Sequence, residues 1–325
     1  GALPGMTATM AIAVFLPLTY SLDLGQALCL LLGLYVGGIS GGLVPAILIN
    51  IPGTPSSITT GFDGHPMAAR GEGERALKIG ITVSLIGGLI SLLALFFFTP
   101  PLAKLAIKFS AVEKFLIIVF AMTVIAALSK GSMTKGVFAG FLGVLVTLIG
   151  RFFDNQQLRM VPSFLTVELG SGFQLLPVLI GLFALSQILE EAEAGMKRNP
   201  KMEGGIKGVN TIRSAAIGTF MGILPGVGGS AASLLSYSQA KNFSKHPDEF
   251  GKGCVDGLVA SEAANNALTG GALIPLLSLG IPGDSTTAVL VGAFLLQGIQ
   301  VGPLFITQNP DLWRDILLGL VVCNI

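Results

Sequence analysis

The chain has 325 residues, of which 52% are hydrophobic and only 11% charged, and its mean hydropathy is +0.79. Because a soluble domain carries roughly 25% charged residues, this composition predicts an integral membrane protein. The net charge of +1 argues against a nucleic-acid partner. The three cysteines are isolated and no Cys/His cluster is present, so no cofactor and no metal site are expected apart from a coupling ion.

Pro-Gly pairs interrupt the apolar sequence at four places. Proline removes a backbone donor and clashes with the preceding helical turn, and glycine adopts backbone angles that stop a helix. Each pair therefore predicts the end of one helix, and the small hydroxylated segment after it predicts the start of the next. In a membrane, free backbone groups are tolerated only where they line a cavity or bind a ligand, so the breaks are the predicted site. They are Leu3-Pro4-Gly5, Ile51-Pro52-Gly53, Leu224-Pro225-Gly226 and Ile281-Pro282-Gly283.

Residues 1–190 are interpreted as a first transmembrane repeat. An apolar half-helix follows the first break, residues 26–51 return into the membrane up to the second break, and a charged turn at 70–78 comes next. The apolar stretches 79–98 and 169–189 are long enough for a span of about 20 residues. Two shorter stretches are either tilted spans or a shallow pair, and these are residues 115–129 and 136–150.

Residues 191–209 form a polar, lysine-rich linker, and residues 210–325 are interpreted as a second repeat. Without a gap, Pro45 aligns with Pro275 and Pro52-Gly53 with Pro282-Gly283. Such paired interruptions are typical of a transporter site. The distribution of Lys and Arg places the linker in the cytoplasm. It gives the repeats opposite directions if the Pro225 unit is a re-entrant hairpin, but not if Pro225 is a kink in one continuous span. The predicted fold is an all-α integral membrane protein, a polytopic helical bundle with two inverted repeats, each with a re-entrant or broken-helix unit.

The new helix starts after the breaks predict an anion-binding site. Free N–H groups and the positive end of a helix dipole suit a carboxylate, and no Lys or Arg lies near any break. Thr54 and Asp284 are the predicted N-caps. The predicted substrate-binding residues are Pro52, Gly53, Thr54, Ser56, Ser57, Gly226, Ser230, Gly283, Ser285, Thr286 and Thr287.

A coupling ion, either Na⁺ or H⁺, is expected near the same breaks. Helix carbonyls left free before a break can coordinate Na⁺, whereas proton coupling needs a carboxylate that titrates. Asp284 can serve either ion, or it can be a helix cap alone, and Glu262 is the alternative proton carrier or an interfacial residue. Helical spacing predicts that Glu262, Asn265 and Asn266 share one face. The predicted coupling residues are Asn50, Gly280, Asp284, Glu262, Asn265 and Asn266.

Several long motifs resemble the large membrane subunit of the tripartite tricarboxylate transporter family. They are PAILINIPGTPSSITTGFDGHPMAARGEGERAL, GILPGVGGSAASLLSYSQAK, SEAANNALTGGALIPLLSLGIPGD and the opening LPG followed by PLTYSLD. The likeness extends over essentially the whole chain. It implies a multi-pass secondary transporter of the bacterial inner membrane, not an enzyme, that imports a small carboxylate with an ion gradient.

The resemblance also implies two protein partners, a small membrane subunit and a periplasmic substrate-binding protein, in addition to membrane lipid. Chains of this family are longer at both ends, so we expect this chain to be truncated at both ends. The resemblance does not fix which carboxylate is carried. The site residues named above come from the helix breaks and not from the family.

Two other functions compete with secondary transport. Gly283-Asp284 is similar to the motif of an intramembrane aspartyl protease, but that chemistry needs a second carboxylate that shares the proton. Only Asp63 and Glu262 are available, and neither has a partner motif. A passive anion channel would favour a continuous polar pore over two broken units. Uptake that collapses when the ion gradient is dissipated distinguishes transport from both alternatives.

Overall fold

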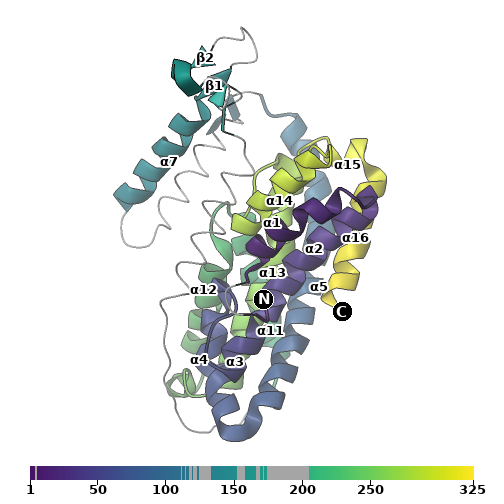
Figure 1. Ribbon diagram of the computed structural model, residues 1–325. Coiled ribbons are helices and arrows are strands. Elements are labelled where there is room, and N and C mark those ends of the chain that lie inside the picture. The colour runs from purple at the N-terminus through teal and green to yellow at the C-terminus, as the bar shows by residue number, and fades with distance from the viewer. Residues whose placement is uncertain are drawn as a thin grey trace.

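In a computed structural model of the chain, the described residues are predominantly helical (Figure 1). The all-α class predicted from the sequence is therefore confirmed. The structure describes residues 1–3, 6–110, 112–113, 115–116, 119, 123, 133–151, 158–165, 169–170, 172–173 and 205–325.

The first half contains a long helix, a break after it, and a second long helical segment. Gly42 keeps helical angles (φ −60°, ψ −23°), so α2 and α3 form one continuous helix of 25 residues. The elements are α1 (Ala8–Thr19), α2 (Leu24–Gly41), α3 (Leu43–Leu48), the 3-10 turn η1 (Pro55–Ser57), α4 (Ile58–Met67), the π-helical turn η2 (Ala68–Glu72) and α5 (Gly73–Ile107).

The second half contains a matching 25-residue helix, α13, between two shorter helices. Its elements are α11 (Gly208–Ile223), α12 (Gly228–Asn242), the 3-10 turn η5 (Pro247–Glu249), α13 (Val255–Leu279), α14 (Ser285–Leu296), α15 (Phe305–Gln308) and α16 (Pro310–Asn324).

Helix α13 is the centre of the described bundle, in contact with α2, α4, α5, α11 and α12. Almost all of its residues are buried, including polar ones, which fits a helix without a polar face. Its neighbours approach closely because small residues stand at the contacts. A Cβ on Gly87 of α5 would lie 2.4 Å from the carbonyl oxygen of Ala263, and one on Gly218 of α11 would lie 2.2 Å from that of Ala264. Backbones therefore touch, as is common between membrane helices.

A small extension lies at the upper end of the view in Figure 1, away from the bundle. It contains α7 (Met133–Thr147), the antiparallel strands β1 (Gly150–Arg151) and β2 (Leu158–Arg159), and the 3-10 turn η3 (Ser163–Leu165). Gly150 pairs with Arg159 and Arg151 with Leu158.

The predicted apolar stretches are only partly covered by the described residues. The stretch 79–98 lies within α5, and the stretch 136–150 contributes most of α7. Most of the stretches 115–129 and 169–189 and most of the linker 191–209 lie outside the described residues, as does the first Pro-Gly pair, Pro4-Gly5. The division into two repeats and their inverted orientation remain predictions.

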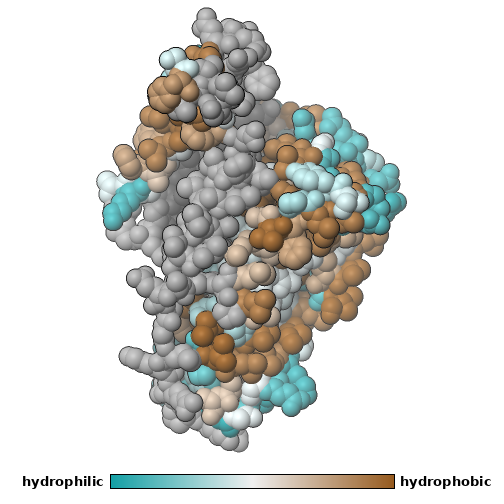
Figure 2. Space-filling view, viewed as in Figure 1, coloured by the Kyte–Doolittle hydropathy of each residue, from teal (hydrophilic) through white to brown (hydrophobic). Residues whose placement is uncertain are grey.

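The surface has the distribution of polarity expected of a membrane protein. In Figure 2, hydrophobic residues cover much of the coloured side of the bundle, and hydrophilic residues gather at its upper right and lower ends. Large apolar side chains are exposed on α5, among them Leu93 at 58% and Phe97 at 65%. Two helical segments in the described part are long and apolar enough to cross a membrane, Leu24–Leu48 and Pro55–Ile107.

Candidate functional site

The breaks at Pro52 and Pro282 share the same local geometry. Before each break the helix ends on a residue in the left-handed region, Asn50 (φ 58°) and Gly280 (φ 75°). The N–H of the next residue, Ile51 or Ile281, then bonds back to the carbonyl of the aligned proline, at 3.3 Å in both cases. These bonds satisfy carbonyls that the ended helix leaves free. The helix ends predicted at the two aligned Pro-Gly pairs are therefore observed, and Asn50 and Gly280 form the turns.

The new helices after these two breaks also begin alike. The Ser57 hydroxyl accepts the N–H of Thr54 at 3.1 Å, and the Thr287 hydroxyl accepts the N–H of Asp284 at 2.9 Å. The Asp284 carboxylate in turn accepts the N–H of Thr287 at 2.7 Å, which completes a capping box. Asp284 and Thr54 thus occupy the N-cap positions that the sequence predicted.

A small cavity of about 120 Å³ lies where four helices begin, at the N-termini of α1, α12, α14 and the η1–α4 segment. Figure 1 shows α1 and α14 in the upper half of the view and α4 and α12 in the lower half. The four helices thus start at the cavity and run away from it in two pairs. The lining residues are Thr7, Ala8, Thr9, Ile39, Thr54, Pro55, Ser56, Gly228, Gly229, Ser230, Asp284, Ser285 and Thr286.

The cavity has two walls. One wall, which we call the Asp284 half, consists of Thr7, Ala8, Thr9, Asp284, Ser285 and Thr286, and the other, the Thr54 half, consists of Thr54, Pro55, Ser56, Gly228, Gly229 and Ser230. Because Pro4-Gly5 aligns with Pro225-Gly226, the residues in one wall are the aligned counterparts of those in the other.

Polar groups in the Asp284 half bond to one another. The hydroxyls of Thr9 and Thr286 are 2.9 Å apart, which joins α1 to α14. Tyr35, fully buried on α2, donates its hydroxyl to Asp284 Oδ2 at 3.2 Å, and the other carboxylate oxygen is held by Thr287. The Thr7 hydroxyl accepts the N–H of Met10 and so caps α1.

In the Thr54 half the hydroxyls of Thr54 and Ser56 bond to each other at 3.1 Å, and close packing joins this segment to α12. A Cβ built on Gly229 would lie 2.7 Å from the Cβ of Ser56, so only glycine allows α12 to approach η1 this closely. The same Cβ would lie 3.1 Å from Oδ1 of Asn265, a fully buried residue of α13. Both polar atoms of the Asn265 side chain lack a hydrogen-bond partner. A buried amide without partners directly behind two lining residues is unusual, because such groups are costly to bury.

The remaining predicted substrate residues lie around the cavity without lining it. The hydroxyls of Ser57 and Thr287 are fully buried and serve the helix caps. Gly226 donates its N–H to the carbonyl of Gly283 at 2.8 Å, so the breaks at Pro225 and Pro282 touch. Of the predicted set, the lining residues are Thr54, Ser56, Ser230, Ser285 and Thr286.

Glu262 lies in a buried polar cluster beside the cavity and does not line it. Its carboxylate accepts hydrogen bonds from Thr60 of α4, from Ser84 of α5 at 3.0 Å, and from Asn266 at 3.3 Å. Ser40 of α2 donates to the Asn266 side chain at 2.5 Å. The cluster therefore links α2, α4 and α5 to α13, and the Glu262 side chain within it is 0% exposed.

Asn265 has different neighbours from Glu262 and Asn266. Glu262 and Asn266 bond to each other, whereas Asn265 bonds to neither and lies against Ser56 and Gly229. The three residues stand at the predicted helical spacing on α13, but Asn265 has different neighbours from the other two. Successive residues of a helix point about 100° apart, and α13 is surrounded by helices, so adjacent asparagines reach different neighbours.

Three residues with polar side chains that build the site were not predicted from the sequence, namely Thr7, Thr9 and Tyr35. Thr7 and Thr9 follow the first Pro-Gly pair as Ser230 follows the third, so the same hydroxyl pattern marks them. Extending the gap-free alignment of Pro45 with Pro275 pairs Tyr35 with Asn265. This alignment is the sequence signal from which Tyr35 could have been predicted as a site residue.

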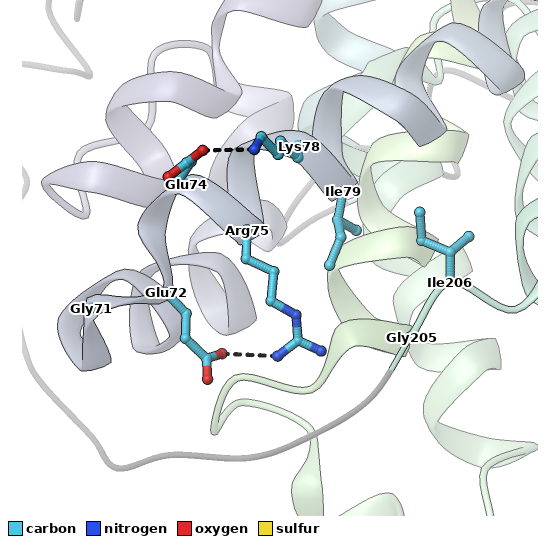
Figure 3. A pocket seen from close by; sticks show the side chains of 8 residues that line it. All are labelled: Gly71, Glu72, Glu74, Arg75, Lys78, Ile79, Gly205 and Ile206. Atoms are coloured by element: carbon cyan, nitrogen blue, oxygen red, sulfur yellow. Dashed lines mark hydrogen bonds and ion pairs between the residues drawn. The ribbon is translucent and has the colours of Figure 1, made fainter.

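A larger hollow of about 600 Å³ lies elsewhere, on the charged turn at residues 70–78 (Figure 3). Its charged side chains pair with one another, Arg75 with Glu72 at 3.3 Å and Lys78 with Glu74 at 2.6 Å. These ion pairs are partly or largely exposed, and exposed ion pairs contribute little to the stability of the fold. This hollow contains none of the predicted site residues and is best explained as a solvated turn.

The fold and the cavity define a helical membrane protein whose small polar cavity is built from helix N-termini. The sequence matches the Tripartite tricarboxylate transporter TctA family over residues 1–325, and the chain therefore belongs to this family. The family membership predicted from the resemblance of the motifs is thus confirmed.

Two relatives come from Agrobacterium vitis. The "Uncharacterized 52.8 kDa protein in TAR-I ttuC' 3'region" is 37% identical over 336 residues, which cover 100% of this chain and 66% of the relative. The "Uncharacterized protein in TAR-II ttuC' 3'region" is 47% identical over 108 residues, 33% of this chain and 45% of the relative. The chain thus spans slightly less than two thirds of the length of the first relative. No solved structure matches the chain.

Proposed function

We propose that this chain is the large membrane subunit of a secondary transporter that imports a small carboxylate across the bacterial inner membrane. The observation that carries the proposal is the cavity at the start of four helices. The positive dipole ends of these helices converge there, together with the uncapped start of α12 and the hydroxyls of Thr54, Ser56 and Ser230. This arrangement binds an anion without a buried Lys or Arg.

The size of the cavity bears on how a substrate is held. Its volume of about 120 Å³ is well below the roughly 300–1,000 Å³ of pockets that hold larger ligands, so it takes one carboxylate group and few further atoms. A tricarboxylate requires the α1–α14 pair to separate from the α4–α12 pair. Movement of one repeat against the other around a fixed site is the usual mechanism of such transporters.

Coupling to Na⁺ or H⁺ is part of the proposal, with Asp284 as the residue that holds the ion. Among the described residues that line the cavity, Asp284 is the only one with an ionisable side chain. Glu262 is the alternative proton carrier. A small membrane subunit and a periplasmic substrate-binding protein complete the proposed transporter, as the family assignment supports.

Single hydroxyl deletions test the site. The full-length protein is expressed with its partner subunits, and uptake of labelled citrate and succinate is measured for the wild type, Ser56→Ala and Ser230→Ala. A hydrogen bond to a charged group contributes about 1.5–3 kcal/mol, so each variant should lose roughly tenfold or more in apparent affinity.

Ser261→Ala is the matched control, because the Ser261 hydroxyl is buried on α13 and donates to the carbonyl of Gly257 at 3.0 Å, away from the cavity. It should transport normally. Unchanged affinity in both cavity variants would remove these hydroxyls from the substrate site. Absence of gradient-driven uptake of either acid by the wild type would count against the proposed function itself.

A further inference from the structure

The two walls of the cavity have the same backbone frame and different side chains at two aligned positions. Asp284 on one wall aligns with Thr54 on the other, and Tyr35 behind the first wall aligns with Asn265 behind the second. In the Asp284 half these two positions bond directly, because the Tyr35 hydroxyl donates to the Asp284 carboxylate at 3.2 Å. In the Thr54 half both side chains are shorter, and no bond joins Asn265 to Thr54.

Two polar side chains of the Thr54 half, those of Asn265 and Ser230, therefore lack the partners that their counterparts have, whereas the hydroxyls of Thr54 and Ser56 bond to each other. Neither atom of the Asn265 amide has one, although the residue is 0% exposed. The Ser230 hydroxyl has none among the described residues, whereas its counterpart Thr9 is bonded to Thr286. Helix α12 begins after Val227, which provides no side-chain cap, whereas α1 is capped by Thr7 and α14 by Asp284. The Asn265 amide, the Ser230 hydroxyl and the uncapped start of α12 thus all belong to the Thr54 half.

We propose that a carboxylate of the substrate binds in the Thr54 half and takes there the place that Asp284 takes in the other half. It accepts hydrogen bonds from the Asn265 amide, the Ser230 hydroxyl and the first N–H groups of α12. A carboxylate supplies acceptors for all of these donors at once. The negative charge of Asp284 excludes the same group from the opposite wall, so the substrate binds in one orientation. This inference rests on the proposed function, since it names how that substrate is held.

Thr54→Asp is the sharpest test, because it places in the Thr54 half the carboxylate that the other half already has. Asp caps a helix at least as well as Thr, so the variant should fold. The new charge occupies the region of the substrate carboxylate and repels it. Uptake of labelled citrate and succinate by the full-length protein with its partner subunits should fall at least tenfold, while the purified variant still folds, with a melting temperature lowered only by the repulsion between the new carboxylate and Asp284.

Asn265→Leu is the second variant and separates a ligand-binding role from a structural one. Leucine has a similar size and removes an amide that bonds to nothing in the described structure, so the melting temperature without substrate should not fall. The rise in melting temperature on adding citrate or succinate should be lost. Ser261→Ala on the same helix is the control and should keep that rise, because its hydroxyl bonds within α13.

The outcomes distinguish the inference from the function on which it rests. If the wild type takes up neither acid, the proposed function fails and the inference fails with it. If the wild type transports, but Thr54→Asp and Asn265→Leu transport within twofold of it, the proposed function stands and the inference is overturned. A fall in the melting temperature of Asn265→Leu without substrate, with its response to citrate and succinate kept, would assign Asn265 a packing role and also overturn the inference.

Discussion

Asp284 performs two tasks in the proposed site, and two substitutions separate them. Its carboxylate caps α14 through Thr287 and accepts the Tyr35 hydroxyl, and it also brings the only ionisable group to the described cavity lining. Asp284→Asn removes the charge and keeps the cap, since Asn and Asp cap comparably. Asp284→Ala removes both. We expect Asp284→Asn to fold normally and to lose ion-coupled uptake.

The difference in stability between the two variants follows from the contacts. Loss of an N-cap costs about 1 kcal/mol. Removal of the carboxylate also leaves the hydroxyl of Tyr35, which is 0% exposed, without its acceptor, at a cost of about 1–3 kcal/mol. Asp284→Ala should therefore be destabilised by about 2–4 kcal/mol and Asp284→Asn by about 1 kcal/mol or less.

The assay combines melting of the purified protein in detergent with uptake of labelled citrate under separately imposed sodium and pH gradients. The dependence of the wild-type rate on sodium at fixed pH identifies the ion. Normal gradient-driven uptake by Asp284→Asn would refute the reasoning. Asp284 would then be a helix cap only, and Glu262 would be the remaining candidate for carrying the coupling ion. If Asp284→Ala were as stable as the wild type, the stabilising roles assigned to the helix cap and to the Tyr35 hydrogen bond would be refuted.

Three further substitutions test neighbouring parts of the bundle. Glu262→Gln should lower stability by about 1–3 kcal/mol, because an amide group then faces hydroxyl donors. The sodium and pH dependence of uptake should stay unchanged, and an altered ion dependence would instead make Glu262 the ion carrier. Gly218→Ala should cost about 1–3 kcal/mol by overpacking against α13, whereas Gly37→Ala, with open space around it, should not, as melting temperatures will show. Asp63→Ala should expose the backbone amides of residues 251–254 to hydrogen exchange, because Asp63 Oδ1 accepts three of their N–H groups at 2.7–2.9 Å; unchanged exchange would contradict this.

The helix ends near the two aligned breaks were predictable because their causes are local. Proline at positions 52 and 282 fixes where the chain leaves the helix, and Thr54 and Asp284 carry the side chains that start the next one. Such signals act over one or two helical turns, so they can be read directly from the sequence. The equivalence of the two turns was predictable for the same reason, since the prolines align and both turns have the same geometry.

The composition of the cavity was less predictable because it depends on packing between distant segments. Ser57 and Thr287 have the same residue type as the lining hydroxyls, but their position in the capping turn directs them inward. Asn265 and Asn266 are adjacent, and only the arrangement of helices around α13 decides that one joins the Glu262 cluster and the other faces Ser56. A buried helix offers no polar face from which such directions can be read.

The charge of Asp284 provides a physical reason for coupling in the proposed transporter. Two negative charges about 6 Å apart repel by about 3 kcal/mol at an effective dielectric constant of about 20, which is roughly a 100-fold loss of affinity. A cation or proton on Asp284 removes that repulsion, so each ligand favours the binding of the other by the same factor. Wild-type affinity for citrate should therefore depend on the coupling ion, and the affinity of Asp284→Asn should not. Equilibrium binding of labelled citrate to both proteins, over a range of sodium concentrations and pH values, measures this factor. Equal ion dependence in the two proteins would show that the ion acts elsewhere.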